Sequence, residues 1–211
     1  MSKIVERVVA QQLREYLAIN DLLPRNQSAY RRHHSTETAM LRVISDVLSE
    51  ANEQRVTLLA LLDMTAAFDC VDHSLLLMRL QWKFGLEKTA LEWMTSFLTG
   101  RTQQVAYIGQ LSPILPVLYG VPQGSVLGQL IFVLYTTELY DVVTKHRVTL
   151  HQYADDCQVY ASTPVPDVQL AIDRLSRCMA DVVTGLMEEA FDLIRATLRS
   201  CGWARSSVLT E

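Results

Sequence analysis

Two adjacent aspartates, Asp155 and Asp156, stand between two short β-prone runs in the segment "VTLHQYADDCQVYAS". A third aspartate, Asp63, ends the apolar run "VTLLALLD". A solvated turn would explain the Asp-Asp pair taken alone. If the strands are neighbours, however, the three carboxylates meet at one sheet edge, where their repulsion raises a pKa or requires a cation.

The chemistry open to such a group of carboxylates is metal-dependent phosphoryl transfer. Carboxylate oxygens suit Mg²⁺ and Mn²⁺. Two such ions about 3.5–4 Å apart can activate an attacking oxygen and stabilise a leaving one. Asp63, Asp155 and Asp156 are therefore candidate catalytic and metal-ligating residues.

The elements that must position these aspartates are predicted from hydrophobic periodicity. Residues 56–63 are a continuous apolar run, which predicts a buried central strand with Asp63 at its end. The Asp-Asp segment predicts strand, turn and strand, and "TQQVAYIG" with "SPILPVLYG" predicts a strand pair linked near Gly109. The order of helices and strands predicts an α+β fold with a sheet backed by helices.

Five helices are expected around this sheet. Their predicted features are an N-terminal helix with Ile4, Val8, Leu13 and Leu17 on one face; a helix capped by Ser35 with a core stripe of Met40, Ile44, Val47, Leu48 and Ala51; a short helix capped by Asp72; a helix over residues 88–98; and an amphipathic helix with Val168, Ile172, Leu175, Met179, Val182 and Leu186. A long apolar helix is also expected after the glycine-bearing turn of residues 120–124, whose glycines fit neither of the common nucleotide-binding loops.

Composition narrows the class of protein. The 211 residues are 49% hydrophobic and 20% charged, which predicts one packed globular domain. The net charge of −4 argues against nucleic-acid binding over the whole surface, although residues 1–35 hold six Lys/Arg against three Asp/Glu. The four cysteines show no metal-site spacing, so we expect reduced thiols in an intracellular protein of the cytoplasm or nucleus. No uninterrupted apolar run reaches about 18–20 residues, and we expect no membrane partner.

Four segments in order carry a family resemblance: "LLPRNQSAYRRHHSTETA", "LLALLDMTAAFDCVDHSLLLMRL", "YGVPQGSVLGQLIFVLYTTEL" and "HQYADDCQVY". Together they resemble the reverse transcriptase domain of non-LTR retrotransposons of the LINE and jockey type. The resemblance implies a right-hand polymerase fingers–palm fold over residues 1–187, with an antiparallel palm sheet backed by helices. It also implies RNA-directed DNA polymerase activity with an RNA template, a DNA primer and dNTPs as partners.

The resemblance further implies a role for each matching residue. Asp63, Asp155 and Asp156 would be the catalytic carboxylates and, with the backbone carbonyl of Met64, would hold two Mg²⁺ or Mn²⁺ ions. Phe68 would be the gate that excludes a ribose 2′-hydroxyl, and Gln123 and Gly124 would lie against the nascent base pair. Tyr153 would pack beside the primer end, and Arg31 would contact phosphates. Asp69 and Asp72 are assigned supporting or capping roles rather than metal binding.

The sequence departs from the family pattern in two places. Gln129 replaces a proline that the family usually has. Residues 188–211 do not resemble the family's lysine-bearing strand and thumb, and no lysine follows Lys145. We therefore expect a fragment truncated before the thumb. Two hypotheses stay open: an RNA-directed DNA polymerase, or a non-catalytic remnant that acts as a nucleic-acid-binding or structural module. An RNA-copying RNA polymerase fits Phe68 poorly.

Overall fold

The structure of the chain is a computed structural model that describes residues 3–64, 68–122 and 124–200, with side-chain surroundings described as far as residue 185. Its elements in chain order are α1 (Lys3–Ile19), α2 (Thr36–Asn52), β1 (Arg55–Leu62), α3 (His73–Trp82), α4 (Lys88–Leu98), β2 (Thr102–Gln103), β3 (Ala106–Tyr107), β4 (Gln110–Leu111), β5 (Leu115–Pro116), α5 (Val126–Tyr135), α6 (Glu138–Lys145), β6 (Thr149–Tyr153), β7 (Asp156–Pro164), a 3-10 turn (Val165–Asp167) and α7 (Val168–Ser200).

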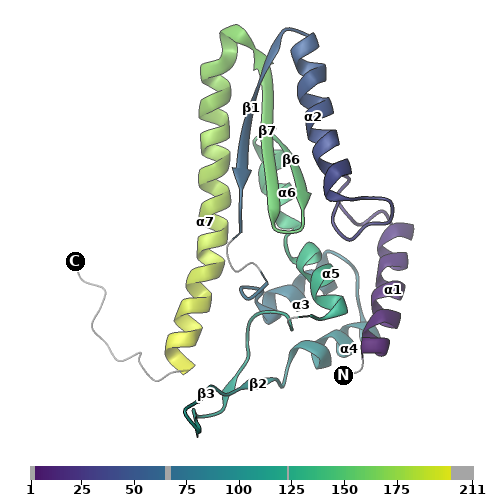
Figure 1. The fold of residues 1–211 in the computed structure, drawn as a ribbon, viewed down its shortest axis with the longest axis vertical. Coiled ribbons are helices and arrows are strands. Elements are labelled where there is room, and N and C mark those ends of the chain that lie inside the picture. Colours follow the sequence, from purple (N-terminus) through teal and green to yellow (C-terminus); the bar gives the residue numbers. More distant parts are fainter. Residues whose placement is uncertain (1–2, 65–67, 123, 201–211) are drawn as a thin grey trace, which may run out of the picture.

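A three-stranded antiparallel sheet lies at the centre, in the order β1-β7-β6. Helix α2 packs on one face, and α6 and α7 cover the other (Figure 1). The predicted α+β class is therefore confirmed. The prediction that β1 is the buried central strand is wrong: β1 is an edge strand, and Leu59 and Leu61 are exposed. The central place belongs to β7, because β6 pairs with one side of it and β1 with the other.

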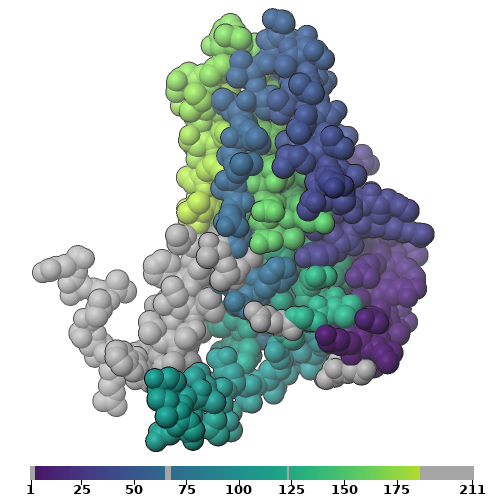
Figure 2. Space-filling model, in the orientation of Figure 1, coloured from purple at the N-terminus to yellow at the C-terminus, as the bar shows by residue number. Residues whose placement is uncertain are grey.

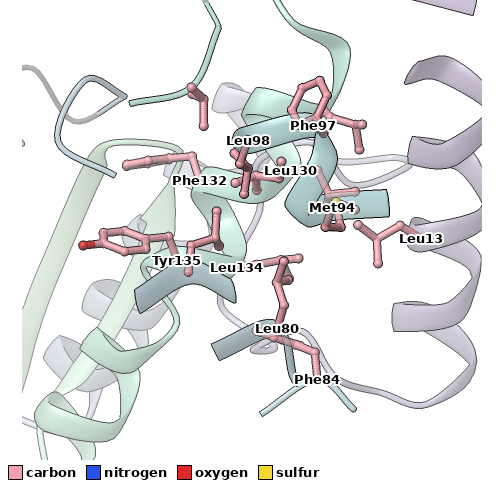
Figure 3. Close-up of a cluster of buried hydrophobic side chains, with 14 of the residues drawn as sticks. Leu13, Leu80, Phe84, Met94, Phe97, Leu98, Leu130, Phe132, Leu134 and Tyr135 are labelled. Atoms are coloured by element: carbon pink, nitrogen blue, oxygen red, sulfur yellow. The ribbon is translucent and has the colours of Figure 1, made fainter. Parts of the chain in front are cut away.

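A second apolar core lies beyond the end of the sheet, where α1, α3, α4 and α5 pack together (Figures 1 and 3). Helix α5 is buried along nearly its whole length. The apolar stretch Val126–Lys145, which spans α5 and α6, is long and apolar enough to cross a membrane by length and composition alone. Because 61% of it is buried within the protein, as in any core helix, it is weak evidence for a membrane span.

The helix ends are where local signals place them, but two buried faces differ from expectation. Ser35 caps α2 in a capping box with Thr38, and Asp72 caps α3. In α1, Leu13 and Leu17 are buried as predicted, but Ile4 and Val8 are exposed. The stripe predicted for α2 is wrong: Met40, Ile44 and Leu48 are exposed, whereas Ala39 and Val43 are buried. In α2 the predicted face (Met40, Ile44, Leu48) and the buried face (Ala39, Val43) both repeat every four residues. Periodicity alone therefore does not choose between adjacent faces of a helix.

The strand pair expected near Gly109 forms two short ladders, β2 with β5 and β3 with β4. Gly109 lies at the tip with φ +72°. The hairpin projects from the lower end of the molecule (Figure 2). It carries exposed apolar side chains, among them Val105, Tyr107 and Ile108. Cys70, Cys157 and Cys178 are free thiols, as expected.

Candidate active site

The three aspartates lie at the same end of the sheet. Leu62, the last residue of β1, pairs with Cys157 of β7, so Asp63 follows the strand beside the β6–β7 turn. Tyr153 pairs with Asp156, which leaves a two-residue turn of Ala154 and Asp155, with Ala154 at φ +57°. The expectation that the two strand segments are neighbours is confirmed.

A cavity of about 370 Å³ opens beside this turn. Asp155 lines it, together with Met64, Phe68 and Gly124. These four predicted residues come from three separate segments of the chain. Asp69 and Gln129, the residue that departs from the family pattern, line the same cavity. The structure thus brings four of the nine predicted site residues around one space.

The carboxylates do not form a metal cage by themselves. Asp63 and Asp156 are exposed and lie outside the cavity lining. Within residues 3–64, 68–122 and 124–200, no group of three or more His, Cys, Asp or Glu side chains is placed to hold a metal ion. The donors are nevertheless of the type that Mg²⁺ uses when one or two carboxylates bind it together with substrate phosphates. The residues present therefore fit a metal that arrives with a triphosphate.

The electrostatics around the turn follow from burial and from these negative charges. Burial raises the pKa of the Cys157 thiol to about 12, and the charges of Asp156 and Asp155 act in the same direction. Burial also raises the pKa of Tyr30, again with Asp155 adding to the effect. Both groups therefore stay protonated, and neither adds a negative charge beside the aspartates.

Phe68 is half-buried, and its ring packs against that of Phe132. Its ring lies 4.6 Å from that of Phe132 in α5, measured between centroids. Because α5 belongs to the apolar core, the ring of Phe68 has a firm support while it lines the cavity. Gly124, on the opposite segment, has φ +70° and nothing within 4 Å of the position a Cβ would take. Gln123 lies outside the described residues, so its predicted role stays a prediction.

The segment before that turn is fastened to the segment that carries Phe68. The amide of Val121 donates to the carbonyl of Phe68 (3.0 Å), and the amide of Gly120 donates to that of Val71 (2.8 Å). His73, which the sequence did not single out, donates from Nε2 to the carbonyl of Gly120 (2.7 Å). Burial lowers the pKa of His73, which keeps its ring neutral. The two walls of the cavity are thus joined by backbone pairing.

Gly120 is the point where this pairing tolerates no side chain. Its φ is +78°, and a Cβ would lie 3.1 Å from the backbone oxygen of Asp69. We expect Gly120→Ala to lower the free energy of unfolding by about 2–3 kcal/mol, measured by urea titration. Gly109→Ala is the matched control, because it has the same strained φ but open space, and should lose about 1 kcal/mol. Equal losses in the two variants would show that the contact with Asp69 has no effect.

The loop after α1 is docked on β6 and supports the aspartate turn. The amide of Ser28 donates to Gln152 O (2.9 Å), and the amide of Gln152 donates to Asn26 O (3.0 Å). Ala29 is buried against Ala154, with Tyr153 packed at the edge of the same cluster. Tyr153 therefore lies beside the turn, and its predicted contact with a primer end stays a prediction.

Arg31 serves this loop directly. Its Nη1 donates to the carbonyls of Pro24 and Gln27, both at 3.1 Å. The phosphate contact predicted for Arg31 stays a prediction. Through its hydrogen bonds to these carbonyls, the guanidinium also stabilises the loop. The sequence did not predict these hydrogen bonds, because it does not show which way the loop carbonyls point.

His151 lies where this loop docks on β6, and we expect it to make the docking sensitive to pH. It is buried, and its Nε2 is 2.9 Å from Ser28 Oγ. Burial lowers the pKa of His151 below its ordinary 6.5, with Arg42 acting in the same direction. The folded state thus binds the proton less readily than the unfolded state, so stability is full above pH 6.5 and is lost as pH falls below it.

We therefore expect the free energy of unfolding of the wild type to fall between pH 7 and pH 5. The variant His151→Gln should show a smaller fall, because glutamine can still hydrogen-bond Ser28 but takes up no proton. Urea titrations at several pH values measure both slopes. Identical slopes would exclude His151 as a contributor.

Comparison with known sequences places this geometry in a family. The sequence profile of the family "Reverse transcriptase (RNA-dependent DNA polymerase)" matches residues 1–194. The chain therefore belongs to the reverse transcriptase family. The match extends slightly beyond the predicted boundary at residue 187, and α7 continues to Ser200. The assignment of residues 188–211 to a divergent tail stays a prediction.

The relatives are polymerases of mobile elements, as the resemblance implied. The chain is 29% identical over 208 residues to the probable RNA-directed DNA polymerase from transposon X-element of Drosophila melanogaster, which covers 97% of this chain and 20% of that protein. It is 30% identical over 164 residues to the RNA-directed DNA polymerase from mobile element jockey of the same species, covering 75% of this chain and 18% of that protein. The chain thus spans about a fifth of the length of these relatives.

Solved structures show the same fold. Apo telomerase from Candida tropicalis, truncated from its C-terminal domain, aligns with a TM-score of 0.57 at 18% identity, over 81% of this chain and 36% of that one. Telomerase from Candida albicans in complex with a fragment of telomeric RNA aligns with a TM-score of 0.51 at 14% identity, over 81% and 31%. These likenesses concern the fold, and they confirm the predicted polymerase class of α+β architecture.

Proposed function

We propose that this chain is the fingers–palm part of an RNA-directed DNA polymerase that adds deoxynucleotides to a primer 3′-hydroxyl opposite an RNA template. The observation that carries the proposal is the cavity shared by Met64, Phe68, Gly124 and Asp155. An acidic turn supplies charge for metal-dependent chemistry, while an aromatic ring and a bare glycine turn shape the space for a nucleotide. A generic metal site would need the carboxylates but not the other two walls.

Asp63, Asp155, Asp156 and the carbonyl of Met64 would hold the metal. The family pattern implies two Mg²⁺ ions, for which Mn²⁺ could substitute. When bound, the metal supplies charge neutralisation for the triphosphate and the attacking hydroxyl. Asp155 is half-buried at the cavity wall, where a carboxylate is less well solvated than on an open surface. Its charge there favours a bound cation more strongly than that of an exposed aspartate.

Phe68 and Gly124 would select and orient the nucleotide. The ring of Phe68 lines the cavity and is supported by Phe132, so in the proposed complex it would exclude a ribose 2′-hydroxyl. Gly124 lets the backbone approach a ligand closely, since no side chain intervenes. Free thiols in the described part of the chain agree with the intracellular location that we propose, in the cytoplasm or the nucleus.

A second candidate function is a non-catalytic module that binds nucleic acid or serves a structural role. One observation favours it: the described residues contain no ready cluster of three metal-ligating side chains. The net charge of −4 gives little general affinity for phosphate backbones. Under this hypothesis RNA–DNA duplex binding persists at low salt without any nucleotide addition.

Primer extension decides between the two. Oligo-dT annealed to poly-rA is incubated with dTTP, Mg²⁺ and either the wild type or the double variant Asp155→Ala plus Asp156→Ala. The polymerase proposal predicts extension by the wild type, loss of extension with EDTA, and none by the double variant. Equal signals from the two proteins would remove the proposal, and duplex binding without extension would favour the non-catalytic module.

A further inference from the structure

A buried carboxylate on the first helix binds the start of α5, next to the cavity. Glu6 of α1 is only 7% exposed. Its Oε2 accepts hydrogen bonds from Ser125 Oγ and from the amide of Val126, both at 2.8 Å, across 119 and 120 residues of sequence. Helices α1 and α5 lie side by side in this region (Figure 1). The contact is therefore a specific tie between the N-terminal helix and the start of α5.

Glu6 binds the N-terminal end of α5, where backbone amides lack acceptors within the helix. The first amides of a helix have no partner within it, and the N-terminal end carries partial positive charge. Ser125 Oγ accepts from the amide of Gly128 (3.0 Å) while donating to Glu6, so the three groups form one chain of hydrogen bonds. Burial by itself raises the pKa of Glu6, but the bonds from Ser125, Val126 and Leu127 outweigh it and hold the pKa below its usual value. Glu6 is thus a charged acceptor.

The same helix end forms a wall of the cavity. Ser125 and Gly128 line it, and Gly124 lies one residue before Ser125. Glu6 itself does not line the cavity and acts on it through its bonds to Ser125 and Val126. Its two hydrogen bonds fix where α5 begins, and the position of the turn before α5 follows from that.

We propose that Glu6 is a positioning residue that holds the start of α5, and with it Gly124 and Ser125, in place at the nucleotide cavity. This proposal rests on the proposed polymerase function for its kinetic consequence, but not for its structural one. The hydrogen bonds of Glu6 go to Ser125 and Val126 at the start of α5, so it should affect how well a nucleotide is held more than how fast it reacts. A charge-assisted hydrogen bond lost from such a tie corresponds to about tenfold in an equilibrium constant.

The test compares Glu6→Ala with Glu6→Gln and with the control Glu15→Ala in the full 211-residue chain. Glu15 lies on the same helix but is exposed, and it accepts a hydrogen bond from the side chain of Gln11. The structural readout is hydrogen exchange of the amides of Val126 to Gly128. The kinetic readout is KM for dTTP against kcat in primer extension on poly-rA.

We expect faster exchange at these amides in Glu6→Ala, and a KM for dTTP raised about tenfold with kcat changed less than threefold. Glu6→Gln keeps an acceptor oxygen but loses the charge, so it should show both shifts at a smaller size, whereas Glu15→Ala should match the wild type. If Glu6→Ala does not fold, Glu6→Gln still tests the proposal by a smaller shift in the same directions.

The failure of this proposal differs from failure of the proposed function. If the wild type extends no primer, the polymerase function fails, and the exchange data alone judge the tie. Unchanged exchange in Glu6→Ala would overturn the proposal whatever the activity. A fall in kcat with constant KM would overturn it as well, because that result would assign Glu6 a general structural role.

Discussion

Replacing Asp155 by asparagine should lower kcat for dTMP incorporation on the order of 100- to 1000-fold, with little change in stability. Asparagine has the same shape as aspartate but no charge. Asp155 is the only one of the three predicted carboxylates that lines the described cavity, so its charge acts where the triphosphate would lie. A charge held in a partly water-excluded site contributes more than one on an open surface.

The matched control for Asp155→Asn is Asp141→Asn. Asp141 is an exposed carboxylate on α6 that pairs with Lys83 and does not line the cavity. Its replacement changes the net charge by the same amount and should leave kcat within twofold of wild type. Primer extension with saturating dTTP measures both variants. An Asp155→Asn protein that retained more than half of the wild-type rate would contradict the assignment of this residue.

Replacing Phe68 by alanine should reduce the preference for dTTP over rUTP by roughly 10- to 100-fold. The ring of Phe68 lines the cavity and is supported by Phe132, so it cannot retreat from a ribose 2′-hydroxyl without disturbing α5. Alanine opens that space. The change also removes a half-buried ring, so a loss of about 2 kcal/mol in stability is expected and should be measured separately by urea titration.

The control for the gate is Phe68→Tyr, which retains the ring. It should preserve the preference for deoxynucleotides, which is measured as the ratio of kcat/KM values for dTTP and rUTP. If Phe68→Ala lost activity equally toward both nucleotides and left this ratio unchanged, Phe68 would be a core residue and not a gate.

The sequence allowed the parts of the fold that depend on local signals to be predicted. The helix over residues 88–98 and the caps at Ser35 and Asp72 are present because capping and periodicity act within a few residues. The edge position of β1 was missed, since an apolar run does not record which strands pair on either side. The buried face of α2 was missed because two neighbouring stripes have the same spacing.

In the candidate site, too, residues placed by local sequence signals could be predicted and residues placed by long-range contacts could not. Asp63 and Asp155 could be associated from sequence because an apolar strand and a tight turn predict their places. Glu6 and His73 could not, since each acts through a bond to a residue far along the chain, Ser125 or Gly120. An acidic residue among the apolar positions of α1 was the available signal, and it became meaningful only when α5 was seen beside it.

The most direct test of the central claim is addition of a single nucleotide opposite a known RNA base. A DNA primer annealed to an RNA template, with rA as the next base, is mixed with excess wild-type protein, Mg²⁺ and one dNTP. A polymerase site at this cavity predicts extension by one residue with dTTP, little with dGTP, and none with dTTP in the Asp155→Asn protein. Extension that ignored the template base, or that was equal in wild type and variant, would contradict it.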